Sequence, residues 1–223
     1  MPPAGLRFLR APVERSNGFD LTLFAQWEAS RESAELLNKS FQKAKNCYSQ
    51  KGLLQWALAQ TKPGLALEFG VFRGQTLSII AKGASEVVGF DTFRGTDLPW
   101  RYDINMNHFD LKGAIPKVPA NAKLVIGKIE ETLERFLDEN PAPIRFVHID
   151  TDVYAPCSFV LETLKKRKRL LPGTVIVFDE FWNYPGWKEH EFKAFQEMEA
   201  KGLKTEFIGF ASSHLSVAVR VLE

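Results

Sequence analysis

Short apolar runs alternate with helical patterns from Gly64 onward, and this alternation constrains the fold more than any other feature of the sequence. β-rich runs that alternate with helices are typical of a parallel sheet built from βαβ units. Several of the runs are apolar throughout, as expected for strands covered on both faces. The predicted strands are 64–69, 86–90, 123–126, 144–149 and 174–178, and the predicted helices are 75–82, 129–138, 155–170 and 187–201.

The last two β-rich segments, 206–211 and 216–222, are separated only by the polar connection 212–215. So short a link predicts an antiparallel hairpin. Five parallel strands followed by a hairpin give a seven-stranded, Rossmann-like α/β sheet. This topology argues against a plain dinucleotide-binding fold, in which helices would also join the later strands.

Two helical patterns, 21–47 and 51–61, precede the first strand. We expect residues 1–62 to form an N-terminal helical extension of the same domain and 63–223 to form the core. Most of the extension is expected to cover one face of the sheet, and its beginning could also form a lid over a cofactor.

Composition narrows the possible partners. The 223 residues carry a formal net charge of +2, which favours neither nucleic acid nor an anionic membrane. No apolar run approaches the roughly 20 residues needed to span a bilayer, and the N-terminus lacks a signal-peptide core. The two cysteines, Cys47 and Cys157, lie far apart and are expected in the interior. These features predict a cytoplasmic protein.

The first strand runs into a glycine-containing turn, with Glu68 before Gly70 and Gly74 before the next helix. Glycines at such a turn let the backbone approach a ligand, and the helix N-terminus offers free N–H groups. The G-x-x-x-G spacing differs from the pyrophosphate motif. A carboxylate at Glu68 would repel pyrophosphate but suits the cationic amino-acid end of S-adenosylmethionine. We expect Thr76, in the following helix, to contact the cofactor as well.

The next two strands end in residues that complete this crevice. Asp91, about twenty residues beyond Gly70, is placed to accept hydrogen bonds from ribose hydroxyls, with Thr92 beside it. Gly127 would let an adenine edge meet backbone groups, and Lys128 and Ile129 follow it. The sequence therefore predicts a cofactor site at the carboxyl ends of the first three strands.

Four carboxylates follow the fourth and fifth predicted strands: Asp150, Asp152, Asp179 and Glu180. If those strands are neighbours, the carboxylates converge at one edge of the crevice. An aliphatic hydroxyl becomes nucleophilic only with a general base or with a cation that stabilises the alkoxide. Two or three carboxylates suffice to bind Mg²⁺, because this ion commonly keeps several waters.

These motifs together resemble the macrocin O-methyltransferase family. GFDTFRG (89–95) is similar to the family's D-[ST]-F-x-G motif, and four further segments match its order and spacing: 67–78, 126–133, 147–154 and 173–187. The resemblance implies a class I methyltransferase fold, S-adenosylmethionine as the donor, and hydroxyls of sugars or natural products as acceptors. Several relatives need a divalent cation.

The resemblance also implies roles for the acidic residues. Asp150, Asp179 and Glu180 correspond to metal ligands, and Asp152 corresponds to the base. Asp150 is expected to take part in catalysis and to contact the cofactor as well. The sequence departs from the family pattern at Thr151, where a glycine is usual, and at Glu180, where an aspartate is usual. These departures leave the metal open.

Other segments are less specific. The connection of about thirty residues after Asp91 is long enough to be a lid or acceptor-binding segment. His148 is expected to be a satisfied core histidine, whereas His108, in the long connection, could act as a base. The basic run 165–169 is expected to be a solvated helix end. The aromatics after the fifth strand favour an acceptor wall, with loop packing as the rival: Phe181, Trp182, Tyr184 and Trp187.

Three functions stay open at this point. The first is an O-methyltransferase for a sugar-like or secondary-metabolite small molecule. The second is a nucleotide-dependent oxidoreductase, which the missing G-x-G-x-x-G motif disfavours. The third is a cofactor-binding relative without catalysis, for which four converging carboxylates have no evident use. The sequence does not fix the acceptor or the oligomeric state, although relatives of this family often form homo-oligomers.

Overall fold

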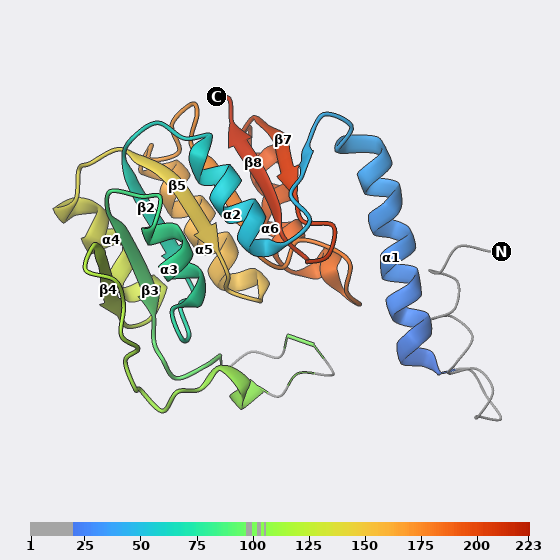
Figure 1. Cartoon of the computed structure of the whole chain (residues 1–223), viewed down its shortest axis with the longest axis horizontal. Helices are drawn as coiled ribbons and strands as arrows, with labels where there is room; N and C mark the ends of the chain where they lie inside the picture. The colour runs from blue at the N-terminus through green and yellow to red at the C-terminus, as the bar shows by residue number, and fades with distance from the viewer. Residues whose placement is uncertain (1–19, 97–99, 102–103, 105) are drawn as a thin grey trace.

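The computed structural model describes residues 20–96, 100–101, 104 and 106–223. A sheet of eight strands forms the centre of the protein, and helices cover both of its faces (Figure 1). The strands are β1 Lys45–Asn46, β2 Leu65–Phe69, β3 Val87–Asp91, β4 Ala122–Ile126, β5 Ile144–Ile149, β6 Val175–Phe178, β7 Thr205–Phe210 and β8 Val217–Val221.

The strand order is β1-β7-β8-β6-β5-β2-β3-β4. All neighbours are parallel except β8, which is antiparallel to both β6 and β7. The predicted α/β class, the central parallel strands and the C-terminal hairpin are confirmed. β5 and β6 are neighbours, which is the condition for the acidic residues after them to meet.

The helices follow the predicted pattern with small shifts. They are α1 Leu21–Ser40, α2 Gln50–Ala59, α3 Gln75–Ala81, α4 Ile129–Glu139, α5 Tyr154–Lys166 and α6 Glu191–Ala200, with short 3₁₀ turns η2 Met106–Phe109 and η3 Trp187–Glu189. α5 ends four residues before the predicted end because Lys168 has a φ of 55°. The amide of Arg169 then bonds to the carbonyl of Leu164, which closes the helix.

The prediction of one helix over 21–47 is wrong. α1 ends at Ser40, and residues 45–46 form β1, which pairs in parallel with β7. Phe41 leaves the helix and stacks between Trp182 and Phe207, with ring centroids 4.9 and 4.2 Å away. The apolar spacing continued past Ser40 because residues beyond the helix pack into the same core, so the pattern could not reveal the break.

α2 covers the same face of the sheet as α3, as expected for most of the N-terminal region. Leu53, Leu54 and Ala57 of α2 are fully buried in a cluster with residues of α3 and the central strands. α4, α5 and α6 supply the larger cluster on the opposite face. A lid made by the beginning of the extension stays a prediction, because residues 1–19 lie outside the described residues, and the division at residues 62 and 63 stays a prediction too.

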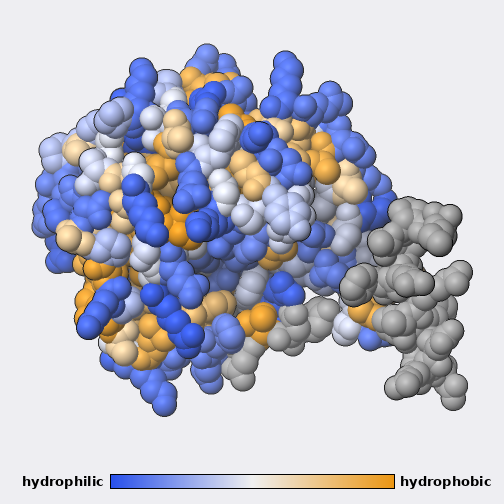
Figure 2. All heavy atoms as spheres, in the orientation of Figure 1, coloured by the Kyte–Doolittle hydropathy of each residue, from blue (hydrophilic) through white to orange (hydrophobic). Residues whose placement is uncertain are grey.

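The surface matches the composition. Hydrophilic side chains cover most of the face shown in Figure 2. None of the helices in the described part of the chain is both long and apolar enough to cross a membrane. Cys157 is fully buried as expected, but Cys47 is only partly buried, which corrects its placement in the interior.

The aromatic contact made by Phe41 yields a stability prediction. We expect Phe41→Ala to destabilise the protein by about 3–5 kcal/mol, because it removes a ring that is 3 % exposed and stacked on two others. Thermal unfolding followed by circular dichroism measures the effect. Leu222→Ala, at a side chain that is 45 % exposed, is the control and should change stability little. Equal losses in the two variants would contradict this account of the N-terminal segment.

Candidate active site

The turn between β2 and α3 forms a cradle with two glycines of positive φ. Gly70 has a φ of 89°, and a Cβ at this position would lie 1.7 Å from the carbonyl oxygen of Asp150. Gly74 has a φ of 75° and begins α3 without a side-chain cap. The free N–H groups of the first turn of α3, which includes Thr76, therefore remain available to a ligand.

Asp91 holds this turn in place. Its Oδ2 accepts hydrogen bonds from the amides of Val71 and Phe72 at 2.8 and 2.7 Å, and its Oδ1 accepts one from Phe93 at 2.7 Å. The sequence indicated only a ligand for ribose hydroxyls and missed this second task. A carboxylate has about four acceptor positions, so Oδ1 retains capacity for a ribose hydroxyl.

The end of β4 lies beside the end of β3, as the crevice requires. Asp91 is paired with Ile126, and the amide of Gly127 donates to the carbonyl of Asp91 at 3.1 Å. Gly127 has a φ of 139°, a conformation that L side chains rarely adopt. Lys128 and Ile129 begin α4 directly after this glycine, and Thr92 follows Asp91 on the neighbouring strand. The predicted cofactor residues therefore gather at one edge of the sheet.

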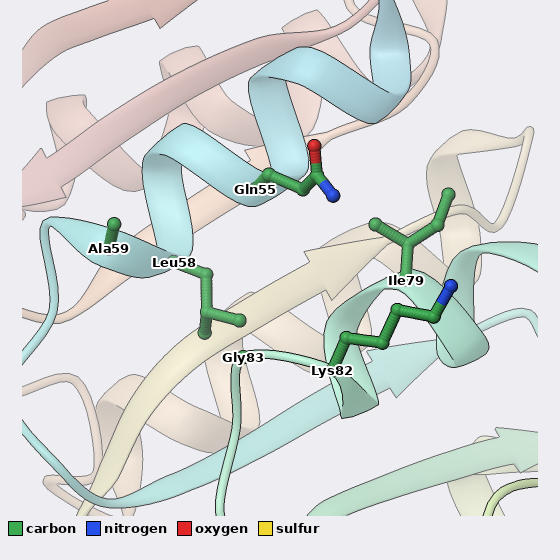
Figure 3. A pocket seen from close by; sticks show the side chains of 6 residues that line it. All are labelled: Gln55, Leu58, Ala59, Ile79, Lys82 and Gly83. Carbon is green, nitrogen blue, oxygen red and sulfur yellow. The ribbon is translucent and has the colours of Figure 1, made fainter.

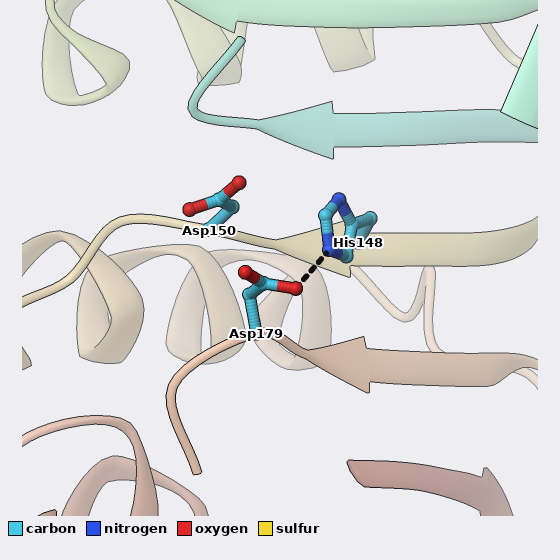
Figure 4. A group of neighbouring side chains, drawn as sticks. All are labelled: His148, Asp150 and Asp179. Carbon is cyan, nitrogen blue, oxygen red and sulfur yellow. Dashed lines mark hydrogen bonds and ion pairs between the residues drawn. The ribbon is translucent and has the colours of Figure 1, made fainter. Parts of the chain in front are cut away.

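Glu68, His148 and Asp179 form a buried hydrogen-bonded chain beneath this edge. Nδ1 of His148 lies 2.9 Å from Oε1 of Glu68, and Nε2 lies 3.3 Å from Oδ1 of Asp179. Figure 4 shows the second contact, with Asp150 beside it. All three side chains are 5 % exposed or less. His148 is the satisfied core histidine that the sequence predicted, but it also joins two strands that carry site residues.

Electrostatics follow from this chain. Burial lowers the pKa of His148, but its hydrogen bonds to Asp179 and Glu68 outweigh burial and raise the pKa well above the usual value. Burial raises the pKa of Glu68, because it disfavours the charged carboxylate. Asp179 behaves differently: burial opposes ionisation, yet hydrogen bonds from His148 and Gln50 bring its pKa below the usual value. The imidazolium therefore compensates the negative charge of Asp179.

Asp179 is the most fully satisfied of the acidic residues. Gln50, the first residue of α2, donates to its two oxygens at 2.8 and 2.9 Å. The hydroxyl of Ser216 donates to Oδ1 at 3.0 Å. The N-terminal extension thus contacts the acidic edge of the site directly, which sequence patterns did not reveal.

The predicted convergence of four carboxylates is confirmed. Oxygens of Asp150, Asp152 and Glu180 lie within 4.8 Å of one another. Atoms of His148, Asp150 and Asp179 form a second group of the same size, so Asp150 belongs to both. Asp150 thus lies within this distance of each of the other two predicted metal ligands, Asp179 and Glu180, but among the described residues the three together do not form a single group. The predicted base Asp152 lies with Asp150 and Glu180.

The pKa values of this cluster are strongly perturbed. Burial, reinforced by the charge of Asp179, raises the pKa of Asp152 to about 7 and raises those of Asp150 and Glu180 well above their usual values. Oε2 of Glu180 is buried and has no hydrogen-bond partner among the described residues. Asp152 also has a φ of 63°, which places its side chain by an uncommon backbone conformation.

Glu191, the first residue of α6, adds a fifth carboxylate that sequence reasoning missed. It is fully buried and accepts hydrogen bonds from the amides of Thr151 and Glu180. Burial raises its pKa, and the charge of Asp179 adds to the effect. Its position four residues after Trp187, within a predicted helix, gave no signal of a role in the site.

Packing in the core, the rival interpretation, accounts for all four aromatics of the expected acceptor wall. Phe181, Trp182 and Trp187 are 0–5 % exposed and belong to the main core cluster. Tyr184 is also buried, but its ring contacts Trp100 of the long connection, with centroids 5.8 Å apart.

The long connection after β3 lies over both halves of the site. Trp100 reaches Tyr184, and Phe109 lies 5.5 Å from Phe72 of the cofactor turn. This placement agrees with the expected covering or acceptor-binding segment, although Pro99 and Tyr102 lie outside the described residues. His108 is exposed, with its ring 6.4 Å from that of Phe72.

The remaining features lie away from the acidic cluster. The basic run at the end of α5 is a helix end with surface ion pairs, such as Arg167 to Glu134, as expected. Two open cavities occur where α2 and α3 end, at the edge of the sheet opposite the carboxylates. One has a volume of about 210 Å³ between Leu58 and Ile79 (Figure 3), and the other has about 340 Å³ beside Arg145.

Solved structures with a similar fold include several methyltransferases. The crystal structure of CalS11, a calicheamicin methyltransferase, is 21 % identical with a TM-score of 0.58, covering 92 % of this chain and 94 % of that one. A second CalS11 structure, described as a TDP-rhamnose 3'-O-methyltransferase, is 21 % identical with a TM-score of 0.53, and the match covers 92 % of this chain and 96 % of that one. An O-methyltransferase from Bacillus cereus in complex with SAH is 16 % identical with a TM-score of 0.50, and the match covers 98 % of this chain and 97 % of that one. These identities establish the fold alone.

The sequence comparison is more specific. No curated protein matches the chain significantly. A family described as a methyltransferase domain matches residues 67–181, which is more than half of the 223 residues and spans the segment from the cofactor turn to the acidic pair. The chain belongs to this methyltransferase family, and the protein is a class I S-adenosylmethionine-dependent methyltransferase.

Proposed function

We propose that the protein transfers a methyl group to a hydroxyl of a sugar-like or secondary-metabolite small molecule. One observation carries the proposal: the carboxylates of Asp150, Asp152 and Glu180 meet beside the cradle, where the backbone of Asp150 touches Gly70. A carboxylate base within reach of the donor suits oxygen, whose proton must be removed for attack. The O-methyltransferases with a similar fold support the same acceptor atom.

The donor site that we propose follows the carboxyl ends of β2, β3 and β4. Gly70 packs against the carbonyl of Asp150, which holds the turn between β2 and α3 close to the acidic residues, and Oε2 of Glu68 is buried without a hydrogen-bond partner in the described structure. That oxygen suits the cationic amino-acid end of the donor. The proposed contacts are Glu68, Gly70, Gly74, Thr76, Asp91, Thr92, Gly127, Lys128, Ile129 and Asp150.

We also propose a divalent cation, Mg²⁺, held by Asp150, Asp179 and Glu180. The unpaired Oε2 of Glu180 and the raised pKa values of its neighbours fit a cluster that a cation would stabilise. The cation would supply a positive charge close to the oxygen that loses its proton. The substitution of glutamate for the usual aspartate at 180 is accommodated, because its oxygens still reach those of Asp150.

Asp152 is the proposed base. Its pKa of about 7 matches the requirement for a group that accepts a proton near neutral pH. It removes the proton from the acceptor hydroxyl while the oxygen attacks the methyl carbon of the sulfonium. The carbon–oxygen bond forms as the carbon–sulfur bond breaks, and S-adenosylhomocysteine leaves as a neutral thioether. Trp100 and Phe109, whose rings contact Tyr184 and Phe72, would shield this transfer from water.

Further expectations concern the alternative activity, the location and the partners. The family match does not favour the nucleotide-dependent oxidoreductase that the sequence left as an alternative. We propose a cytoplasmic location because both cysteines are free thiols. A small-molecule acceptor, rather than nucleic acid or a membrane, stays the expected partner, and homo-oligomer formation stays open.

The proposed base predicts a separation of binding from transfer. Asp152→Asn should lower methyl transfer by about 10²–10⁴-fold, because the amide cannot accept the hydroxyl proton. Affinity for S-adenosylhomocysteine should stay within about threefold, since the donor cradle is unchanged. The acceptor is first identified with the parent protein, by screening a panel of nucleotide sugars and glycosylated natural products for formation of S-adenosylhomocysteine.

Glu139→Gln is the matched control, because it removes a carboxylate from an exposed position of α4. It should leave transfer and binding unchanged. Full transfer by Asp152→Asn would contradict the assignment of the base. Binding of S-adenosylhomocysteine with no transfer to any acceptor by the parent protein would instead favour a relative without catalysis.

The acidic cluster also predicts how stability depends on pH. The folded pKa of Asp152 lies above its ordinary value, so folding favours the protonated form. Its contribution to stability is present below about pH 4 and is lost as pH rises through about 7. We therefore expect the Tm of the metal-free protein to fall by several degrees between about pH 5 and 8.

Differential scanning fluorimetry with and without Mg²⁺ checks this trend. Bound cation stabilises the ionised carboxylates, so Mg²⁺ should raise Tm more at pH 8 than at pH 5. Asp152→Asn should flatten the slope of the metal-free protein. A Tm that rises across this range without metal would contradict the raised pKa values.

A further inference from the structure

The acidic residues of the site lie on two loops that follow the paired strands β5 and β6. The pairing continues to the amide of Asp179, which donates to the carbonyl of Ile149 at 2.9 Å, and it ends before Asp152 and Glu180. Asp150 and Asp152 belong to the loop between β5 and α5, whereas Glu180 belongs to the loop after β6. Their oxygens approach within 4.8 Å, although like charges at this distance repel. Beyond the paired residues, an additional interaction is therefore needed to hold these oxygens close against their repulsion.

Glu191 makes that interaction. Its Oε1 accepts a hydrogen bond from the amide of Thr151 at 3.4 Å, and its Oε2 accepts one from the amide of Glu180 at 3.0 Å. Thr151 is the residue between Asp150 and Asp152. One carboxylate thus bonds both loops, at the residues that carry or flank the site carboxylates.

The position of Glu191 is energetically unfavourable apart from this task. The side chain is fully buried, and Asp152 and Asp179 lie close enough to raise its pKa. No ion pair to Glu191 occurs among the described residues. Burial of a carboxylate without a cationic partner is costly, so two backbone amides at its two oxygens are the compensation that the fold supplies.

We propose that Glu191 is a positioning residue, which sets the distance between the loop of Asp150 and Asp152 and the loop of Glu180. The proposal rests on the proposed function, because positioning matters for the transfer that those carboxylates perform. Glu191 is fully buried and is not among the proposed donor contacts. Its position at the start of α6 ties the acidic edge to the helix layer behind the sheet.

Two substitutions test the proposal in the full-length protein. Glu191→Asp retains the charge but shortens the side chain by one methylene, so it cannot reach both amides. Glu191→Gln retains the length but places a donor against one amide. Glu189→Gln is the control, because its side chain is 72 % exposed and lies on the 3₁₀ turn directly before α6.

Nuclear magnetic resonance gives the readout. In both Glu191 variants the amides of Thr151 and Glu180 should exchange with solvent about tenfold faster, which corresponds to the loss of one buried hydrogen bond. The carboxyl carbon resonances of Asp150, Asp152 and Glu180 should shift in Glu191→Asp, although the charge is kept. The control should leave all of these signals unchanged.

The outcomes are distinct. Carboxyl shifts that appear in Glu191→Gln alone would show an effect of charge and would overturn the positioning role. Unchanged amide exchange in both variants would overturn it as well. If neither variant folds, hydrogen-bond couplings from the two amides to the Glu191 carboxyl carbon in the parent protein decide the question, and their absence overturns the proposal. Titration of the same samples with S-adenosylhomocysteine tests the proposed function separately.

Discussion

A buried chain of hydrogen bonds from Glu68 through His148 to Asp179 joins the donor half of the site to its acidic half. It crosses β2, β5 and β6, which are neighbours in the sheet. The imidazole lies between two carboxylates that would otherwise be buried with uncompensated charge. The donor cradle and the acidic cluster depend on this arrangement, because the cradle begins at the end of β2 and the acidic residues follow the ends of β5 and β6.

Repulsion between carboxylates is the constraint that the surrounding structure has to balance. Asp179 has four donor contacts, from His148, Gln50 and Ser216, and stays ionised. Asp150, Asp152 and Glu180 have fewer donors, and their pKa values rise. Asp179 is thus neutralised largely by the protein, whereas the other three carboxylates lack such donors among the described residues. A cation held by Asp150, Asp179 and Glu180 would chiefly balance the charges of Asp150 and Glu180, and a transferred proton would balance that of Asp152. This division explains why a base with a pKa near 7 can exist beside an ionised neighbour.

The sequence predicted most of the fold because strands, helices and the hairpin each have a local pattern. Apolar runs gave β2 to β8, and their order along the chain gave the acidic residues a common edge. The prediction from sequence failed where the same apolar spacing continued through two backbone conformations. This happens at Phe41, where α1 ends but the side chains beyond it are still buried. β1 has only two residues and no pattern of its own, so it could not be predicted.

The site was predictable to the extent that its residues follow strands. Gly70, Asp91 and the four carboxylates lie where strand ends placed them. Three contributions could not be seen in the sequence: the hydrogen bonds of Asp91 to the turn after β2, the contact of Gln50 with Asp179, and the hydrogen bonds of Glu191 to two loops. Each depends on the three-dimensional approach of segments far apart in the chain. The aromatic residues after β6 misled for a related reason, since a buried ring and a ligand-facing ring look the same in sequence.

Anomalous diffraction from crystals grown with S-adenosylhomocysteine and Mn²⁺ tests the central claim most directly, since Mn²⁺ prefers the same oxygen ligands as Mg²⁺. The account predicts S-adenosylhomocysteine against Gly70 and Gly74, and an anomalous peak at coordination distance from Asp150, beside the sulfur. Density for the donor product in another place, or a Mn²⁺ peak remote from Asp150, would contradict the account of a donor cradle joined to an acidic, cation-binding edge.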